Sequence, residues 1–212
     1  DLKKFEENQI AKRAKFRSEY NLDDDEIAIG IVGRLVPIKN HELFLKALKI
    51  VSERTTKKVR AFVIGDGEER MKIEQLAQSL GLKFNNQNLK EKNFLTFTSW
   101  IKEIDVSNAG MDIIALTSNN EGTPVSLIEA QASGKPIVST KVGGIENIVL
   151  ENETALLSSV GDEKVFAENL LRLIESDEMR FNFSKKGSDF VRSKFSYQRL
   201  CKDTEKLYNS LL

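Results

Sequence analysis

The stretch that decides the fold is residues 113–131, which read IIALTSNNEGTPVSLIEAQ. Its first four residues are apolar and mostly branched, over a length typical of a buried strand. Thr123 suits the N-cap of a helix, and Pro124 then takes the first helical position, where its missing N–H would have no partner anyway. The stretch therefore predicts a strand, a loop and a helix in direct succession.

The predicted helix start is also a candidate anion site. The N–H groups of Val125 and Ser126 lack partners within the helix, and the helix dipole favours negative charge beside them. Two carboxylates bracket this site: Glu121 in the loop, and Glu129 inside the helix, about 7.5 Å from its start along the axis. The alternative is a surface loop and an ordinary helix with two solvated carboxylates.

Composition narrows the class of protein. Acidic and basic residues balance at 32 each, which argues against a general electrostatic grip on nucleic acid or on an anionic membrane. There is no signal peptide and no apolar run of membrane-spanning length. Cys201, the single cysteine, excludes an internal disulfide, fits a reducing, cytoplasmic compartment and is expected to pack in the last helix. A single histidine, His41, excludes a multi-histidine metal site. At a helix start it could act as a general base, but we favour a partly exposed residue of the first turn.

Strand and helix patterns alternate along the chain. This alternation predicts an α/β fold, a Rossmann-like parallel sheet of about six strands with helices on both faces, followed by C-terminal helices. Residues 83–93 are expected to be a polar loop. The expected strands are 27–32, 59–64, 94–98, 113–116, 137–139 and 154–157, and the last helices are 163–174, 178–191 and 197–211.

The unusual turns all follow expected strands, at the edge where such sheets bind ligands. Arg34 and Lys39 lie between a strand end and a helix that Asn40 can cap, beside Gly33. Cations are disfavoured at a helix start unless an anion is present, so the pair suggests a phosphate clamp, with two surface cations as the alternative. Trp100 ends another strand there and either lines a base pocket or packs under a loop.

Other nucleotide motifs are incomplete. The turn Gly65-Asp66-Gly67 lacks the third glycine of a dinucleotide fingerprint, which disfavours a nicotinamide or flavin cofactor. No P-loop pattern is present, so the chain is not a P-loop NTPase. For Asp66 we favour a role in the turn.

Together these motifs resemble the group 1 (family four) glycosyltransferases, which are retaining, nucleotide-sugar-dependent enzymes with the GT-B fold. The resemblance rests on Gly33-Arg34 with Lys39, on Gly65-Asp66-Gly67-Glu68, on the spacing of Glu121 and Glu129, and on later turns. Those turns are Gly134-x-Pro136-Ile137-Val138 and Val142-Gly143-Gly144. Nearly the whole chain is covered, but it matches only the C-terminal, donor-binding half of such an enzyme.

The resemblance implies a role for each site residue. Arg34 and Lys39 would hold the diphosphate and stabilise the departing nucleotide, and Glu121 would contact the donor sugar; these three are the implied catalytic residues. Glu129 would bind the ribose, and the edge near Thr98–Ile101 the base. The donor-binding set is Gly33, Arg34, Lys39, Thr98, Ser99, Glu121, Gly122, Thr123, Pro124, Val125, Ser126 and Glu129. The donor would be a UDP-, GDP- or ADP-sugar, and neither metal nor other cofactor is expected.

The resemblance also implies a domain plan. Residues 1–26 would be a linker and leading helix, 27–194 the nucleotide-sugar-binding domain, and 195–212 a helix that packs against an N-terminal domain. The chain begins at Asp1 without Met and looks like a fragment, expected to bind donor without turning it over. With its N-terminal domain it would transfer a hexosyl or N-acetylhexosaminyl group to a cell-surface polysaccharide or lipid-linked glycan, at or near the inner face of the membrane.

Departures from the family pattern leave alternatives open. Thr123-Pro124 stands where many members have Phe-Gly, Ser99 stands at a frequent glycine position, and Ile145-Glu146 follows the double glycine. These differences put the identity of the donor sugar in doubt. The chain could also belong to a GT-B nucleotide-sugar epimerase, or be a non-catalytic sugar-nucleotide-binding module.

Overall fold

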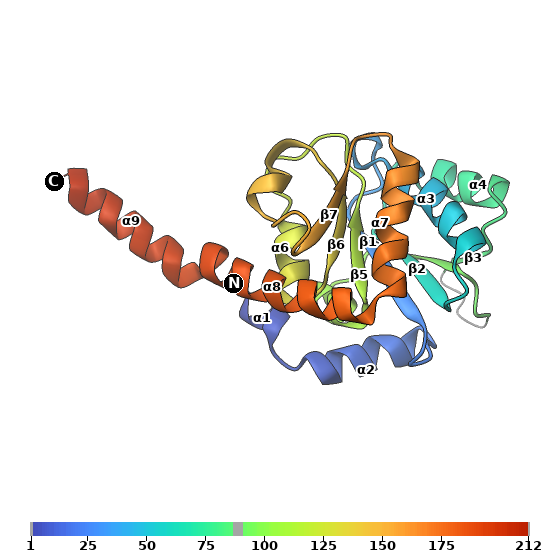
Figure 1. The fold of residues 1–212 in the computed structure, drawn as a ribbon, viewed down its shortest axis with the longest axis horizontal. Helices are drawn as coiled ribbons and strands as arrows, with labels where there is room; N and C mark the ends of the chain where they lie inside the picture. The colour runs from blue at the N-terminus through green and yellow to red at the C-terminus, as the bar shows by residue number, and fades with distance from the viewer. Residues whose placement is uncertain (1, 87–90, 212) are drawn as a thin grey trace.

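The computed structural model describes residues 2–86 and 91–211. One parallel sheet organises the molecule, with strand order β3-β4-β2-β1-β5-β6-β7 (Figure 1). This confirms the predicted α/β architecture. The strands are β1 (Ile27–Val32), β2 (Val59–Ile64), β3 (Phe84–Asn86), β4 (Leu95–Ser99), β5 (Ile113–Leu116), β6 (Ile137–Thr140) and β7 (Ala155–Ser158).

Strand β3 was not predicted, because it lies within the expected polar loop 83–93. It is a three-residue edge strand that pairs only with β4 among the described residues. Its asparagines carry little strand propensity, so non-local pairing decides its conformation. Asn93 Nδ2 donates to Asn85 Oδ1 at 2.6 Å and ties the strand to the chain that follows. Residues 87–90 of the same predicted loop lie outside the described residues.

Helices cover both faces of the sheet. The side chains of Ile29 and Ile31 point into the core under α3, α4 and α7, whereas Ala28 and Ile114 face the core under α2, α5 and α6. The helices are α1 (Lys3–Glu6), α2 (Gln9–Glu19), α3 (His41–Arg54), α4 (Arg70–Ser79), α5 (Ile104–Gly110), α6 (Val125–Ala132), α7 (Glu163–Glu175), α8 (Asp177–Phe195) and α9 (Tyr197–Leu211), with 3₁₀ turns η1 (Pro37–Lys39) and η2 (Gly143–Asn147).

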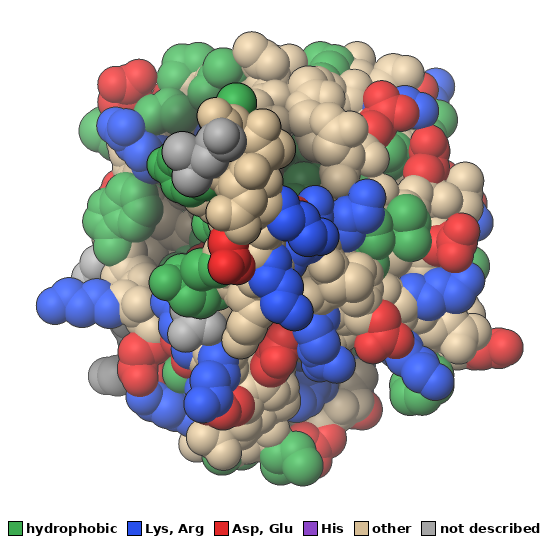
Figure 2. Space-filling view, turned by 90° about the vertical axis from the view of Figure 1, so that its left-hand side faces the viewer, with side chains coloured by type: hydrophobic (Ala, Val, Ile, Leu, Met, Phe, Trp, Pro, Cys, Tyr) green, Lys and Arg blue, Asp and Glu red, His purple; other side chains and the backbone are tan. Residues whose placement is uncertain are grey.

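The last helix stands apart from this body. Ser196 has an extended backbone that separates α8 from α9, and α9 projects away from the sheet (Figure 1). None of its described residues is buried. On the side of the molecule from which α9 projects, hydrophobic, basic and acidic side chains are intermixed (Figure 2). Cys201 is exposed, so the expectation that it is a packing residue of the last helix is wrong. Across residues 2–86 and 91–211, we find no helix with the length and hydrophobicity needed to cross a bilayer.

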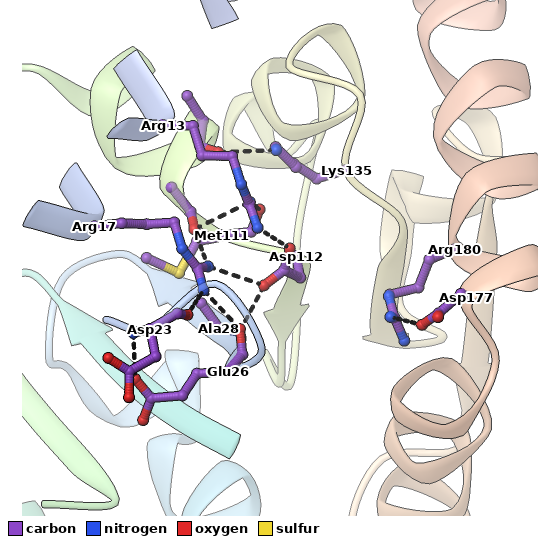
Figure 3. A network of polar contacts seen from close by, with 12 residues as sticks. Arg13, Arg17, Asp23, Glu26, Ala28, Met111, Asp112, Lys135, Asp177 and Arg180 are labelled. Atoms are coloured by element: carbon purple, nitrogen blue, oxygen red, sulfur yellow. Dashed lines mark hydrogen bonds and ion pairs between the residues drawn. The ribbon is translucent and has the colours of Figure 1, made fainter. Parts of the chain in front are cut away.

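A buried charge network fixes α2 beneath the amino ends of the strands (Figure 3). Asp112, just before β5, accepts hydrogen bonds from Arg13 Nη2 at 2.8 Å, Arg17 Nη1 at 3.3 Å and the backbone N–H of Ala28 at 2.8 Å. Nearby, Lys135 donates to the carbonyl of Ala109, and burial lowers the pKa of its ammonium to about 8. These bonds hold α2, β1 and the residue before β5 together at the amino ends of the strands. A ligand site is expected at the opposite, carboxyl ends.

The winding of the chain reverses at β1. This strand pairs with β2 on one side and β5 on the other. In open parallel sheets, the crevice outside the carboxyl ends at such a switch point is the usual ligand site. The loops after β1 and β5, which carry Arg34, Lys39 and Glu121, contact each other at this edge of the sheet.

Candidate functional site

At the carboxyl ends of β1 and β5, a cation contacts a carboxylate. Lys39 Nζ lies 2.5 Å from Glu121 Oε1, and the two side chains are 24% and 11% exposed. Ser118 Oγ donates to the same carboxylate oxygen at 2.6 Å. The structure thus brings together two residues that the sequence had placed on separate loops, and adds a third that the sequence did not single out.

Backbone bonds join the two loops into one rigid edge. The N–H of Asn119 donates to the carbonyl of Ile38 at 2.8 Å, and Thr117 Oγ1 donates to the carbonyl of Lys39 at 2.9 Å. Asn40 caps α3 as predicted, since its side chain accepts from the N–H of Leu43. These bonds hold Lys39 against the end of β5.

Two glycines let neighbouring loops approach the site closely. A Cβ on Gly143, whose φ is +51°, would lie 1.7 Å from the carbonyl oxygen of Glu121. A Cβ on Gly65, at the end of β2, would lie 2.0 Å from the carbonyl oxygen of Gly33. At Gly33 itself a Cβ would make only ordinary van der Waals contact with the side chain of Lys39. Steric crowding therefore does not require a glycine at this position.

Helix α6 begins one residue later than predicted. Pro124 is buried and extended, with ψ 99°, so it takes the N-cap position itself and supplies no side-chain acceptor. The prediction that Thr123 is the N-cap is therefore wrong; Thr123 is exposed. Val125 and Ser126 remain the first helical residues, and the first N–H groups of a helix have no partner within it. An anion site at this helix start is compatible with the observed geometry.

Arg34 contrasts with Lys39. It is exposed, and within the described part of the chain no residue forms a hydrogen bond or ion pair with its guanidinium. A guanidinium at a strand end has five N–H donors suited to a phosphate. Arg34 is thus the cation of this edge that is ready for an incoming anion.

The end of β4 is held in an unusual backbone conformation. Ser99 has φ +70°, in the left-handed region that glycine adopts more readily than other residues. Its hydroxyl donates to Asp66 Oδ2 at 2.7 Å, and Asp66 Oδ1 accepts from the N–H of Gly67. These bonds lower the pKa of Asp66 and confirm its role in the turn. Trp100 is 62% exposed, which excludes packing under a loop, and Thr98 Oγ1 donates to backbone carbonyls.

Glu129 lies on α6, eight residues after Glu121, and its side chain is half-buried. Burial raises the pKa of its carboxyl, and the positive charge of Lys4 opposes this shift. No hydrogen-bond donor to its carboxylate is recorded among residues 2–86 and 91–211. A half-buried carboxylate without a donor is free to accept hydroxyl groups.

The expectation that His41 is partly exposed is wrong. Its side chain is 2% exposed, and burial, followed by the charge of Lys39, lowers its pKa to about 4. The sequence does contain the signal: His41 precedes Leu45 and Leu48 by one and two turns, so it continues the buried stripe of α3. The imidazole is neutral near pH 7.

Comparisons with known proteins agree with this fold. A model of the family described as glycosyl transferases group 1 matches residues 12–190. The D-inositol 3-phosphate glycosyltransferase of Corynebacterium urealyticum is 28% identical over an alignment that covers 100% of this chain and 49% of that protein. The chain therefore spans about half the length of that relative.

Two solved structures share the fold. The C-terminal domain of a group 1 glycosyl transferase (LpcC) from Francisella tularensis aligns with TM-score 0.76 and 24% identity, over 93% of this chain and 98% of that one. Alr3699/HepE from Anabaena, in complex with UDP, aligns with TM-score 0.86 and 21% identity, over 99% of this chain and 55% of that one. With the family model matching most of its length and its fold matching a C-terminal domain, the chain belongs to the group 1 glycosyltransferases.

Proposed function

We propose that this chain is the donor-binding domain of a retaining glycosyltransferase that uses a nucleotide sugar. The observation that carries the proposal is the contact of Lys39 and Glu121 at the switch point between β1 and β5. Arg34 lies on the same loop as Lys39, and α6 begins at the end of the loop that carries Glu121. Both the guanidinium and the helix start favour an anion. The UDP complex of the structurally similar Anabaena protein is consistent with a nucleoside diphosphate here.

Each group has a distinct task in the proposed reaction. Charge develops on the diphosphate as the bond to the sugar breaks, and fixed donors that face this charge stabilise the transition state more than the ground state. Arg34, Lys39 and the N–H groups of Val125 and Ser126 would supply these donors. Glu121 would accept a hydroxyl of the sugar.

The rest of the nucleoside would lie along the same edge. Glu129 would accept hydrogen bonds from the ribose hydroxyls, because it is half-buried and has no recorded donor. The base would lie near Thr98 and Ser99, with the exposed ring of Trp100 beside it. The remaining residues of the predicted donor set, Gly33, Gly122, Thr123 and Pro124, would shape the backbone around the phosphate and the sugar. The reaction would need no metal and no further cofactor.

The acceptor would come from a second domain. We propose that residues 1–26 link to that domain and that α9 packs against it. Apolar side chains project from α9 at helical spacing and are exposed in this chain: Tyr197, Leu200, Leu207, Tyr208 and Leu211. The acceptor would be a glycan or a lipid-linked glycan on the cytoplasmic side of a membrane, and the product would keep the configuration of the donor.

Isothermal calorimetry tests donor binding on this chain. UDP, GDP and ADP are titrated into the protein in separate experiments. UDP-glucose, GDP-glucose and ADP-glucose are then titrated in the same way. The proposal expects at least one nucleoside diphosphate to bind with a dissociation constant of about 1 mM or lower, and to raise the melting temperature. Absence of heat and of any thermal shift with all three would overturn it.

A further inference from the structure

A buried hydroxyl, that of Ser118, donates a hydrogen bond to the carboxylate of Glu121. Ser118 has no exposed surface, and its Oγ donates to Glu121 Oε1 at 2.6 Å. The carbonyl of Ser118 in turn accepts from Thr140 Oγ1 at 2.6 Å, and Thr140 lies fully buried on β6. The chain of contacts therefore runs from the interior of the sheet to the carboxylate.

One oxygen of Glu121 serves two donors. Oε1 accepts from Ser118 and also contacts Lys39 Nζ at 2.5 Å. Among the described residues, no donor is recorded for Oε2. The ammonium sits on a long flexible side chain, whereas the hydroxyl is fixed by β6 and the end of β5. The two partners of Oε1 thus differ in how easily they can leave it.

We infer that Ser118 is a positioning residue, which keeps Glu121 oriented and hydrogen-bonded while Lys39 moves from the carboxylate to the diphosphate of the donor. The inference rests on the proposed function of this edge and adds a step to it. Lys39 serves two anions in turn: Glu121 in the empty site and the diphosphate in the loaded site. Ser118 stays on Glu121 in both states.

The burial of Glu121 makes this second partner necessary. A carboxylate that is 11% exposed loses much of its hydration, so moving Lys39 away without another donor on the carboxylate is unfavourable. The hydroxyl of Ser118 offsets part of that cost, because a hydrogen bond to a charged group is among the strong ones. Diphosphate binding therefore becomes more favourable, because Lys39 can move away while the carboxylate of Glu121 keeps a hydrogen-bond donor.

Neighbouring hydroxyls do a different job. Thr117 Oγ1 donates to the carbonyl of Lys39, and Thr140 Oγ1 to that of Ser118, so both satisfy the backbone. Of these three hydroxyls, that of Ser118 is the one on a carboxylate. Thr117 therefore provides a matched control, since its hydroxyl is equally buried, one residue away, and bonded to the backbone.

A double-mutant cycle on this chain tests the inference. Ser118→Ala, Glu121→Gln and the double variant are titrated with the nucleoside diphosphate that binds wild type best among UDP, GDP and ADP. Glu121→Gln raises affinity, because Lys39 no longer has a competing anion. Ser118→Ala lowers affinity about tenfold in the wild-type background and less than about twofold when Gln replaces Glu121.

The possible outcomes distinguish a failure of the inference about Ser118 from a failure of the proposed function. If Ser118→Ala weakens binding by the same factor in both backgrounds, as Thr117→Val is expected to do, Ser118 is only structural and the inference is wrong. If wild type binds none of the three nucleotides, the proposed function fails and the inference fails with it. Should Ser118→Ala not fold, as judged by its melting temperature, Ser118→Cys takes its place: it keeps the volume but donates weakly, and a smaller loss confined to the Glu121 background is expected.

Discussion

Lys39 Nζ and Glu121 Oε1 are 2.5 Å apart although 82 residues separate them in the chain. They follow β1 and β5, the adjacent strands at which the winding of the sheet reverses. Both side chains are mostly shielded from solvent, so their attraction is stronger than that of a surface pair. An anion that binds at this edge must therefore compete with Glu121 for Lys39, whereas the guanidinium of Arg34 has no partner to give up among the described residues.

The two cations are expected to respond differently to truncation. Arg34→Ala should lower nucleoside-diphosphate affinity about tenfold without lowering the melting temperature, since its guanidinium has no partner to lose among the described residues. Lys39→Ala should lower affinity and also the melting temperature, because it leaves Glu121 with a buried charge. Calorimetry and thermal unfolding measure both effects.

Arg172 supplies the control for this pair. It is exposed in the last turn of α7, away from the carboxyl edge, and Arg172→Ala removes the same charge. The affinity of the Arg172→Ala variant for the nucleoside diphosphate should stay within about twofold of wild type. A loss equal to that of Arg34→Ala would mean that net charge, and not the position of the cation, governs binding.

The approach of η2 to the Glu121 loop predicts a sharp difference between two glycines. In Gly143→Ala the new Cβ would meet the carbonyl of Glu121 at 1.7 Å, at a φ of +51°, so we expect destabilisation by about 2 kcal/mol or more. In Gly122→Ala nothing lies within 4 Å of the new Cβ, so stability should stay within about 0.5 kcal/mol. Urea unfolding of both variants is the measurement, and equal stabilities would contradict the close approach.

His41 predicts a pH dependence of stability. Its pKa is lowered from 6.5 to about 4 in the folded chain, so the unfolded chain binds a proton that the folded chain excludes between these values. The free energy of unfolding should therefore fall by about 3 kcal/mol as pH drops from about 6.5 to about 4, and no such contribution exists above pH 6.5. Urea unfolding of wild type and His41→Gln over this range isolates the effect. The two curves should converge at low pH, and parallel curves would contradict the assignment.

The network around Asp112 should dominate the stability of the amino edge. Asp112→Ala leaves Arg17, whose side chain is 4% exposed, without its carboxylate, and should cost about 3 kcal/mol. Glu103→Ala breaks the exposed pair with Lys15 at 2.5 Å and should lower stability far less, because solvent screens this pair. Denaturant midpoints compare the two, and similar losses would show that the buried network is not a fold determinant.

The regular elements could be predicted because local patterns carry them. The apolar runs 27–32, 59–64 and 113–116 became β1, β2 and β5 with the expected bounds, and the alternation of strands and helices predicted the parallel sheet. Strand β3 could not be predicted, since its asparagines favour a loop and pairing with β4 decides otherwise.

The charged residues of the site could be predicted, but not their contacts. Arg34, Lys39 and Glu121 were identified because they follow strand ends, and the structure places their loops on neighbouring strands. The contact of Lys39 with Glu121 depends on the tertiary fold. Ser118 gives no periodic signal, so its bond to Glu121 is visible only in three dimensions. The helix start was misplaced by one residue because propensity does not decide whether Pro124 is helical or extended.

Backbone amide shifts on titration with a nucleoside diphosphate test the central claim most directly. The 24.0 kDa chain is suited to ¹H–¹⁵N NMR spectroscopy. With whichever of UDP, GDP and ADP binds, we expect the largest shifts at the amides of Arg34, Lys39, Val125 and Ser126, and little change at Arg172. If the largest shifts occurred at the amino edge, around Arg17 and Asp112, they would contradict a nucleotide site at the carboxyl ends of β1 and β5.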